Sequence, residues 1–372
     1  MRKKIAVLGI TGSIGESTVK IVDHHADQFE IVFASAHTNY QELLQIAKNM
    51  KIKKIVLSAK EPKIHLHDSG IKLYQGQDIL LDLIRNEDFD VLINAVSGSA
   101  GLIYTIACLE RGKDLALANK ESLVMAGHII QELLLQHKAQ ILPVDSEHSA
   151  IFQLLHRHPQ DEIKCLHLTA SGGPFRTLPW NEFSQINLHK TLQHPTWSMG
   201  KKVTIDSATM LNKGLEVIEA HWLFGIEYER IKALIHPQSI VHSMIEFIDG
   251  SIFAQMSSPT MQLPILYALT HPHHIMSTKV ETNLENLATL SFEPIDPKRY
   301  PLFHLACQAG RMGGIMPTVL NAANEKAIKL FCQNKISFIE MPLYVENVLN
   351  SIENISHPDL ETILAINEEL QK

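Results

Sequence analysis

The sequence predicts an α/β protein with three parts: an N-terminal doubly wound parallel sheet, a central α+β catalytic domain and a small helical C-terminal domain. Short apolar runs alternate with amphipathic stretches over the first 145 residues, which favours right-handed crossovers and a parallel sheet. Beyond residue 150 strand-like runs mix with one strong helical pattern, and the last 70 residues show helical spacing. Ligands of a doubly wound sheet bind beyond the carboxyl ends of its strands, so we expect functional residues in the turns after strands.

The composition is that of a globular protein with more than one domain. The 372 residues are 45% hydrophobic and 20% charged, which is enough for a sizeable core. A net charge of −7 without a basic tract argues against nucleic acid and anionic membranes as partners. The four cysteines form no CxxC pair, and no apolar run is long enough to span a bilayer. These features predict a cytoplasmic protein with reduced cysteines.

The first domain is predicted to span residues 1–149. Each of its strands is a short apolar run, and helical patterns such as Thr18–His24 and Tyr40–Asn49 lie between most of them. The predicted strands are Ile5–Leu8, Ile31–Ser35, Lys54–Leu57, Val91–Ala95, Asp114–Ala118 and Ala139–Val144.

The central domain is predicted over residues 150–275, and its dominant element is a helix at Ala208–Phe224. Residues 276–302 contain three prolines and no sustained periodicity, so we expect a connecting segment there. A helical domain is expected from 303 to 372, with Pro317 at the first position of one helix. The predicted strands of the central domain are Lys164–Thr169, Ile231–Ile235, Ser239–Phe247 and Ser251–Gln255.

A glycine-rich turn follows the first predicted strand and opens a helix. Gly9, Gly12 and Gly15 let the backbone approach a pyrophosphate at the helix N-terminus, which favours a Rossmann-type nucleotide-binding domain over an ordinary glycine turn. Residues 35–39, after the second strand, contain no Asp or Glu to bind the ribose hydroxyls of NAD, so NADP is predicted. The candidates for its 2′-phosphate are His37, Thr38 and Asn39, and a plain polar turn explains them nearly as well.

Two carboxylates follow the last strand of the predicted sheet. Asp145 and Glu147 are two residues apart, so in an extended segment both would point the same way and could bind one hard cation. A helix cap explains the pair alone better than a metal site does. A third carboxylate is needed, and Glu216 can supply it from the polar stripe of the predicted helix, which Asn212 and Glu219 share. A solvated helix face is the alternative for that stripe.

Anion-binding residues are predicted in three stretches. Ser171 precedes two glycines after a strand, where amides and a hydroxyl can bind an anion, and a simple turn is the alternative. Ser207, Asn212 and Lys213 gather in one stretch and suit a phosphate. Lys120 follows another strand and is either a fixed cation near substrate oxygens or a solvated lysine.

The segment His194–Gly200 carries Trp197 and Met199 between a proline and a glycine. Large apolar side chains in such a loop need somewhere to bury. A lid that closes over substrate explains them, and so does a structural plug.

Taken in order, these motifs resemble the 1-deoxy-D-xylulose 5-phosphate reductoisomerase family over essentially the whole chain. The chain departs from that family after the second strand, where many members have a Gly-Lys/Arg-Asn run and this chain has His37-Thr38-Asn39. The segments that carry the resemblance are TGSIG (11–15), ALANKESLV (116–124), VDSEHSAIFQ (144–153), SGGPF (171–175), HPTWSMG (194–200), DSATMLNKGLEVIEA (206–220), HPQSIVHSM (236–244) and PTVLNAANE (317–325).

The resemblance implies conversion of 1-deoxy-D-xylulose 5-phosphate to 2-C-methyl-D-erythritol 4-phosphate in the non-mevalonate isoprenoid pathway. It further implies a homodimer that uses NADPH and Mg²⁺, Mn²⁺ or Co²⁺. By matching motif, the implied catalytic residues are Lys120, Glu147 and His194, and the implied metal ligands are Asp145, Glu147 and Glu216. The implied substrate ligands are Lys120, Ser146, Ser171, His194, Trp197, Met199, Ser207, Asn212 and Lys213. The implied cofactor ligands are Thr11, Gly12, Ser13, Ile14, His37, Thr38, Asn39, Asn119, Glu121 and Gly200.

Two other functions fit part of this pattern. A metal-independent dehydrogenase of the homoserine or semialdehyde type also carries Asn-Lys after a strand, as at Asn119 and Lys120, and strict dependence on a divalent cation would separate the two. A non-catalytic NADP-binding module leaves the three carboxylates and the Ser/Asn/Lys stretch unexplained. Turnover of the sugar phosphate would exclude it.

Overall fold

The computed structural model describes residues 1–59, 70–156, 158–197, 199–286 and 289–372, which form two compact units. The chain passes between the units several times, so neither is one continuous stretch. The predicted boundaries at residues 149, 275 and 302 stay a prediction. Unit 1 comprises Met1–Asn119, Ile130–Ser149 and Thr260–Val280, and unit 2 comprises Lys120–Ile129, Ala150–Pro259 and Glu281–Lys372.

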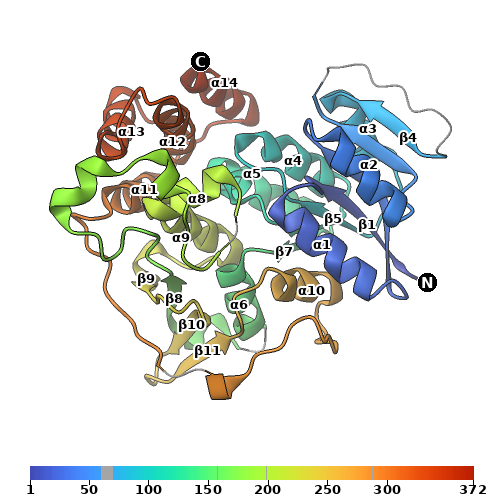
Figure 1. Ribbon diagram of the computed structural model, residues 1–372, viewed down its shortest axis with the longest axis horizontal. Coiled ribbons are helices and arrows are strands. Elements are labelled where there is room, and N and C mark those ends of the chain that lie inside the picture. The colour runs from blue at the N-terminus through green and yellow to red at the C-terminus, as the bar shows by residue number, and fades with distance from the viewer. Residues whose placement is uncertain (60–69, 157, 198, 287–288) are drawn as a thin grey trace. The chain divides into compact units, whose positions relative to one another are not determined.

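Unit 1 is built on a seven-stranded sheet in which every neighbouring pair is parallel, and this confirms the predicted doubly wound α/β fold (Figure 1). The order β4-β3-β2-β1-β5-β6-β7 reverses its direction at β1, the position at which such sheets bind ligands. The strands are β1 (Lys3–Leu8), β2 (Phe29–Ala36), β3 (Lys54–Leu57), β4 (Lys72–Gln75), β5 (Val91–Asn94), β6 (Asp114–Leu117) and β7 (Ile141–Pro143).

Six of these strands lie where the sequence predicts them, and their burial explains why. Ile5, Val7 and Leu8 of β1 are fully buried, and β5 is buried along its whole length. Parallel strands covered on both faces give such continuous apolar runs. The prediction missed β4, because Lys72–Gln75 is a partly exposed edge strand with no apolar run.

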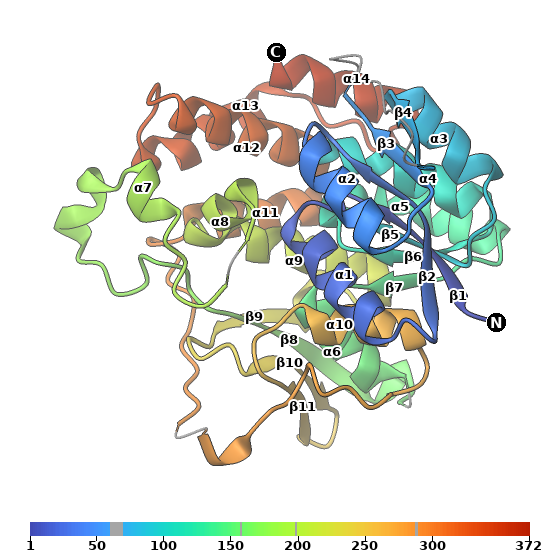
Figure 2. The same cartoon turned by 45° about the vertical axis from the view of Figure 1, so that its right-hand side comes forward.

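Helices α1 (Ser13–His24), α2 (Tyr40–Asn49), α3 (Gln77–Asn86) and α4 (Leu102–Glu110) connect strands of unit 1. Helices α5 (Lys120–Gln136) and α6 (Ser146–Leu155) each contribute residues to both units. α10 (Gln262–Thr270) returns to unit 1 from much later in the chain, packs against α1, β6 and β7, and lies beside α1 in Figures 1 and 2. It is largely apolar and buried, so it covers a surface of unit 1 that the first 149 residues leave open.

Unit 2 contains a four-stranded sheet in the order β11-β10-β8-β9. β8 runs parallel to β9, and β10 runs antiparallel to both of its neighbours. Leu166 and Leu168 of β8 pack in the hydrophobic core with Val217. Because side chains alternate along a strand, Cys165 and His167 face the other side of the sheet. The strands are β8 (Ile163–Ala170), β9 (Ile231–Ile235), β10 (Val241–Phe247) and β11 (Ile252–Met256).

The helix predicted at Ala208–Phe224 is confirmed as α9 (Leu211–Phe224), although it begins three residues later than predicted, because Ala208 ends the preceding helix, α8 (Lys201–Ala208). Met210 between them has a left-handed backbone, with φ 59° and ψ 10°, which ends one helix and starts the next. Its side chain is buried in the core of unit 2, so tertiary packing stabilises a conformation that methionine rarely adopts. The break places a new helix N-terminus directly before Asn212.

The remaining helices of unit 2 pack around α9 and one another. α9 contacts α11, and α12 contacts α11, α13 and α14. Pro317, predicted at the first position of a helix, is the second residue of α12. Within the described residues, no helix combines the length and apolar character needed to cross a membrane. These helices are α7 (Leu188–Thr191), α11 (Pro301–Met312), α12 (Met316–Cys332), α13 (Met341–Ser351) and α14 (Leu360–Gln371).

Candidate active site

The turn after β1 requires glycine at two positions. Gly9 has a φ of 76°, and a side-chain carbon there would lie 2.6 Å from the Ala95 carbonyl oxygen. At Gly15 such a carbon would lie 2.2 Å from the Ile10 carbonyl oxygen. The first amides of a helix have no partner within it, so the start of α1 has the geometry of an anion site. This start contains the predicted phosphate ligands Thr11, Gly12, Ser13 and Ile14.

The turn after β2 is exposed, and two of its side chains, those of His37 and Asn39, form hydrogen bonds. Asn39 caps α2, because its side chain accepts a hydrogen bond from the Glu42 amide at 3.4 Å. This is what the plain-turn alternative predicts for Asn39. His37 Nδ1 lies 2.9 Å from Ser58 Oγ, and both His37 and Thr38 face solvent. His37 and Thr38 are therefore the better placed candidates for a 2′-phosphate.

Two buried asparagines fix the turn after β5. Asn94 Nδ2 donates to the Gly101 carbonyl oxygen at 2.9 Å. Asn119 Nδ2 donates to the carbonyl oxygens of Val96 and Gly98 at 2.8 and 2.7 Å. The Asn119 amide thus holds the backbone of a neighbouring turn in place, in addition to any cofactor contact.

The segment after β7, which carries Asp145 and Glu147, is helical rather than extended. β7 ends before Asp145, and the Asp145 carbonyl oxygen accepts a hydrogen bond from the Ser149 amide at 2.8 Å as α6 begins. Glu147 lies in the first helical turn, so the prediction that Asp145 and Glu147 point the same way along an extended segment is wrong. Ser146 is buried, and its hydroxyl donates to Glu147 Oε2 at 2.6 Å. A carboxylate is favourable at this position because the helix dipole is positive there.

A buried cluster of unit 2 surrounds the carboxylate of Glu216. That residue is 1% exposed, so the polar stripe of α9 is not a solvated face there. Lys120 Nζ lies 2.9 Å from Oε1, Asn212 Nδ2 donates to the same oxygen at 2.5 Å, and Lys213 forms an ion pair with Oε2. Lys120 is also buried, which excludes the solvated-lysine alternative. An unpaired charge is costly to bury, so the two lysines and the carboxylate stabilise one another.

Unit 2 contains a second buried ion-pair network, which was not predicted from the sequence. Lys202 Nζ lies 2.7 Å from Glu121 Oε1 and 2.9 Å from Asp206 Oδ2, and Asn324 donates to Asp206 at 2.8 Å. Burial lowers the pKa of Lys202, but Asp206 and Glu121 outweigh it and hold that pKa above its usual range. Burial raises the pKa of Glu121, yet Lys202 holds it below its usual value. The four-residue spacing of Lys202 and Asp206 on one helix is the signal that could have found this pair.

His194 joins two hydroxyls that the sequence predicts as phosphate ligands. Its Nε2 lies 3.0 Å from Ser171 Oγ and 3.1 Å from Ser207 Oγ. Its Nδ1 accepts hydrogen bonds from the amides of Thr196 and Trp197 at 3.1 and 2.9 Å, so the proton of the neutral ring lies on Nε2. Burial lowers the pKa of His194 to about 4, which keeps the ring neutral near pH 7. The cluster therefore offers hydroxyls and one N–H to an anion.

The loop that carries Trp197 has an aromatic contact that the sequence did not reveal. The half-buried Trp197 ring has its centroid 6.3 Å from that of His242, a buried residue of β10. Met199 is half-buried as well. Gly200 is exposed and precedes α8, where its carbonyl oxygen accepts a hydrogen bond from the Thr204 amide at 3.0 Å. Both a lid and a structural plug fit these contacts.

The two units define a class of protein: an α/β enzyme with a dinucleotide-binding sheet and a second unit rich in buried charged side chains. Three family models match the chain in turn. The 1-deoxy-D-xylulose 5-phosphate reductoisomerase model matches residues 5–127, the C-terminal domain model of that enzyme matches 141–224, and the DXP reductoisomerase C-terminal domain model matches 256–372. The chain belongs to the 1-deoxy-D-xylulose 5-phosphate reductoisomerase family.

Individual relatives agree with this membership over nearly their full lengths. The chain is 45% identical over 370 residues to the 1-deoxy-D-xylulose 5-phosphate reductoisomerase of Halothermothrix orenii, covering 98% of this chain and 96% of that one. The solved enzyme from Zymomonas mobilis in complex with NADPH superposes with a TM-score of 0.91 at 39% identity, covering 100% and 97% of the two chains. A DOX-P reductoisomerase in complex with NADPH, fosmidomycin and magnesium superposes with a TM-score of 0.91 at 34% identity, covering 99% and 96%.

Proposed function

We propose that this chain catalyses the NADPH- and divalent-cation-dependent conversion of 1-deoxy-D-xylulose 5-phosphate to 2-C-methyl-D-erythritol 4-phosphate, in the non-mevalonate isoprenoid pathway. The observation that carries the proposal is family membership over essentially the whole chain. In chemical terms the ketose first rearranges its carbon skeleton to an aldehyde without a change in overall oxidation state. NADPH, when bound, supplies a hydride to that aldehyde, and a proton completes the alcohol.

The proposed metal ligands are Asp145, Glu147 and Glu216. All three donate oxygen, the ligand type that Mg²⁺ and Mn²⁺ prefer, so the chemistry of the donor set fits such a cation. A cation bound there would polarise the substrate carbonyl and lower the pKa of the adjacent hydroxyl. Lys120 and Lys213 hold the Glu216 carboxylate in position. We assign Lys120 and Glu147 to the reacting oxygens of the substrate.

We assign the substrate phosphate to Ser171, His194 and Ser207, together with Asn212 and Lys213. The first three are already joined by hydrogen bonds through His194 Nε2. As a neutral N–H donor, His194 would contribute a directed hydrogen bond, whereas Lys213 would contribute positive charge. Holding the phosphate at a distance from the reacting carbons lets its binding energy orient those carbons.

Three further residues are proposed to contact the substrate: Ser146, Trp197 and Met199. Ser146 already donates to the proposed catalytic residue Glu147 at 2.6 Å, so it would also orient that carboxylate. Trp197 and Met199 would close over the substrate and exclude water from the aldehyde.

The cofactor is proposed to bind at the start of α1, where Thr11, Gly12, Ser13 and Ile14 would hold its phosphates. His37 and Thr38 would contact the 2′-phosphate, with Asn39 in its capping role. Glu121 is ion-paired with Lys202, so its charge is already compensated. We therefore expect it to contact the cofactor without contributing a net negative charge. The other proposed cofactor contacts are Asn119 and Gly200.

We also propose that the protein is a cytoplasmic homodimer. The edge strand β11 exposes the large apolar residues Ile252, Phe253 and Met256, and a second copy would cover such an edge. Light scattering tests this part of the proposal. A mass near twice the 41.8 kDa of one chain supports it, and a mass of one chain at micromolar concentration contradicts it.

Oxidation of NADPH in the presence of 1-deoxy-D-xylulose 5-phosphate, with and without EDTA, tests the function. We expect turnover with Mg²⁺, loss of turnover with EDTA, and recovery when excess Mn²⁺ is added. Turnover that survives EDTA would favour a metal-independent dehydrogenase. Cofactor binding without any turnover would favour an NADP-binding module.

A further inference from the structure

A cluster of potential metal ligands lies on the sheet of unit 2, outside the proposed active site. Cys165 and His167 are two residues apart on β8, so both side chains face the same side of the sheet. Glu246 is the register partner of Cys165 on β10. Leu166, between the first two, faces the core in which α9 packs. The cluster therefore occupies the face of the sheet opposite α9, the helix that carries Glu216.

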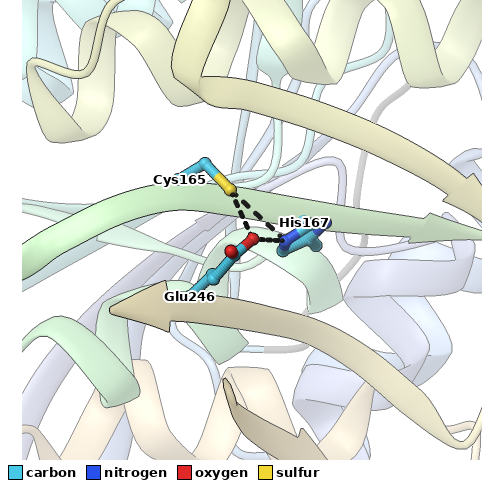
Figure 3. Close-up of side chains that lie close together, drawn as sticks. All are labelled: Cys165, His167 and Glu246. Carbon is cyan, nitrogen blue, oxygen red and sulfur yellow. Dashed lines mark hydrogen bonds and ion pairs between the residues drawn. The ribbon is translucent and has the colours of Figure 1, made fainter. Parts of the chain in front are cut away.

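The three ligand atoms converge, as Figure 3 shows. Cys165 Sγ lies 3.1 Å from Glu246 Oε2 and 3.3 Å from His167 Nε2, and His167 Nε2 lies 2.9 Å from Glu246 Oε2. Around a tetrahedral zinc ion with its usual bond lengths, such atoms lie about 3.4–3.6 Å apart. Each pair would need to separate by about half an ångström at most. Ordinary side-chain adjustment supplies movements of this size.

Two lysines adjoin the cluster: Lys164 contacts Glu246, and Lys232 lies beside the Cys165 thiol. Cys165 is 3% exposed, and the side chains of His167 and Glu246 are 11% and 15% exposed, so the site is shielded but reachable from solvent. Hydrogen bonds from Lys164, Cys165 and His167 lower the pKa of Glu246 to about 2, so its carboxylate is an anion at neutral pH. Lys164 contacts Oε1 at 2.7 Å, which turns Oε2 toward the thiol and the imidazole.

We propose that Cys165, His167 and Glu246 bind a thiophilic divalent cation such as Zn²⁺, with water as the fourth ligand. A thiolate, an imidazole and one carboxylate favour Zn²⁺ or Co²⁺ over Mg²⁺, which prefers oxygen ligands alone. The bound ion would link β8 to β10 at a register pair and would displace the thiol proton of Cys165.

The affinity should be moderate for two reasons. Burial raises the pKa of the Cys165 thiol, so the ion competes with a tightly held proton. His167 Nδ1 is buried and has no hydrogen-bond partner in the part of the chain that the structure describes. An acceptor at that nitrogen usually orients a ligating imidazole, and its loss typically weakens binding by roughly 10- to 100-fold.

Titration of the full-length protein with Co²⁺ tests the site, after removal of bound metal with a chelator and return to chelator-free buffer. A thiolate bound to Co²⁺ gives charge-transfer absorption in the near ultraviolet, which the oxygen-only set of Asp145, Glu147 and Glu216 cannot give. We expect this absorption in the natural protein and its loss in Cys165→Ser. The matched control is Cys332→Ser, which alters a half-buried cysteine at the end of α12 and should keep the absorption.

Glu246→Gln gives a second measurement that does not remove the sulfur. We expect the same absorption band, with a midpoint shifted to at least about tenfold higher Co²⁺ because a charged ligand has been lost. Turnover with Mg²⁺ should be unchanged in Cys165→Ser and Glu246→Gln, so failure of this inference is distinguishable from failure of the proposed function. Absence of the band in the natural protein, or an equal band in Cys165→Ser, would show that the three residues form a hydrogen-bonded cluster only. An unshifted midpoint in Glu246→Gln would overturn the three-residue site by showing that Glu246 is not a ligand.

Discussion

The two units hold their buried polar groups by different means. In unit 1 neutral amides dominate, since Asn94 and Asn119 both donate to carbonyl oxygens of the turn after β5. In unit 2 full charges are buried: Glu216 pairs with Lys120, and Lys202 pairs with two carboxylates. The difference corresponds to what each unit is proposed to bind. Amides at a helix start suit the phosphates of a nucleotide, whereas a phosphorylated sugar needs a fixed charge such as that of Lys213.

The difference also predicts how much free energy of unfolding a substitution costs in each unit. Removing one partner of a buried ion pair leaves a charge without compensation and costs about 3–5 kcal/mol. Removing a neutral hydrogen-bonding partner from a buried group costs about 1–3 kcal/mol. Substitutions in the charged clusters of unit 2 should therefore have larger effects than comparable substitutions in unit 1.

The largest effect is expected for Glu216→Gln, which keeps size and polarity but removes the charge. Affinity for Mn²⁺ and turnover should fall together by orders of magnitude, because a hard cation loses an anionic ligand. Binding of NADPH, which rests on unit 1, should persist. Titration with Mn²⁺, steady-state rates and cofactor fluorescence measure the three quantities, and higher Mn²⁺ should restore part of the activity.

Glu229→Gln is the matched control for that substitution, because Glu229 is an exposed glutamate of unit 2. It should leave metal affinity, rate and melting temperature unchanged. Near-normal metal affinity and rate in Glu216→Gln would show that Glu216 is not a metal ligand. The charged cluster around Glu216 would then have a structural role only. The buried charges of unit 2 would not be explained by binding of a cation.

Lys202→Met tests the buried network without altering a proposed metal ligand. It leaves Glu121 and Asp206 without their cation, so the free energy of unfolding should fall by about 3–5 kcal/mol. Burial raises the pKa of Glu121, but Lys202 outweighs it and holds the folded-state pKa below its ordinary value of 4.5, so this stabilisation is present above pH 4.5 and is lost as the pH falls through the folded-state value. Urea unfolding of both proteins at pH 7 and at acidic pH should show the difference shrinking. A difference that does not change with pH would contradict the pairing.

Trp197→Ala should affect the substrate more than stability. Because the ring is only half-buried, we expect kcat/KM for the substrate to fall by at least about tenfold, or 1.4 kcal/mol, while the melting temperature changes little. Trp180→Ala removes another, half-exposed indole of unit 2 and should leave the kinetics unchanged. A large loss of melting temperature with normal kinetics in Trp197→Ala would identify the loop as a structural plug.

The smallest effect is expected in unit 1, in the choice of cofactor. The absence of a carboxylate after β2 should give a preference for NADPH over NADH of at least about tenfold in kcat/KM. His37→Ala should reduce this preference, whereas His24→Ala, at an exposed histidine at the end of α1, should not. Equal efficiency of the natural protein with both cofactors would show that the turn after β2 does not contact a 2′-phosphate.

Local patterns in the sequence predicted much of the fold. The elements Tyr40–Asn49, Lys54–Leu57 and Ile231–Ile235 match the structure to the residue, because each is a periodic or apolar run with clear ends. The break at Met210 was not predictable in this way. Apolar residues continue at helical spacing across it, and core packing rather than local preference sets its left-handed conformation.

In the candidate site, too, local sequence patterns predicted some contacts and missed those between distant segments. The family resemblance implied that Ser171 and Ser207 hold the substrate phosphate and that His194 contacts the substrate, and in the structure these residues share hydrogen bonds through one imidazole. The pairing of Lys202 with Glu121 was missed, because 81 residues separate them and no local pattern links them. Contacts between distant segments depend on tertiary packing, which periodicity does not encode.

α10 has a consequence for the synthesis of this protein on the ribosome. Translation delivers the chain from its N-terminus, yet the stretch that completes unit 1 ends at residue 280 of 372. Until that stretch emerges, the apolar surfaces of α1, β6 and β7 that α10 covers are open to other nascent chains. The growing polypeptide should therefore need protection by a chaperone until α10 emerges, and a ribosome that stalls before that point should release an aggregation-prone product.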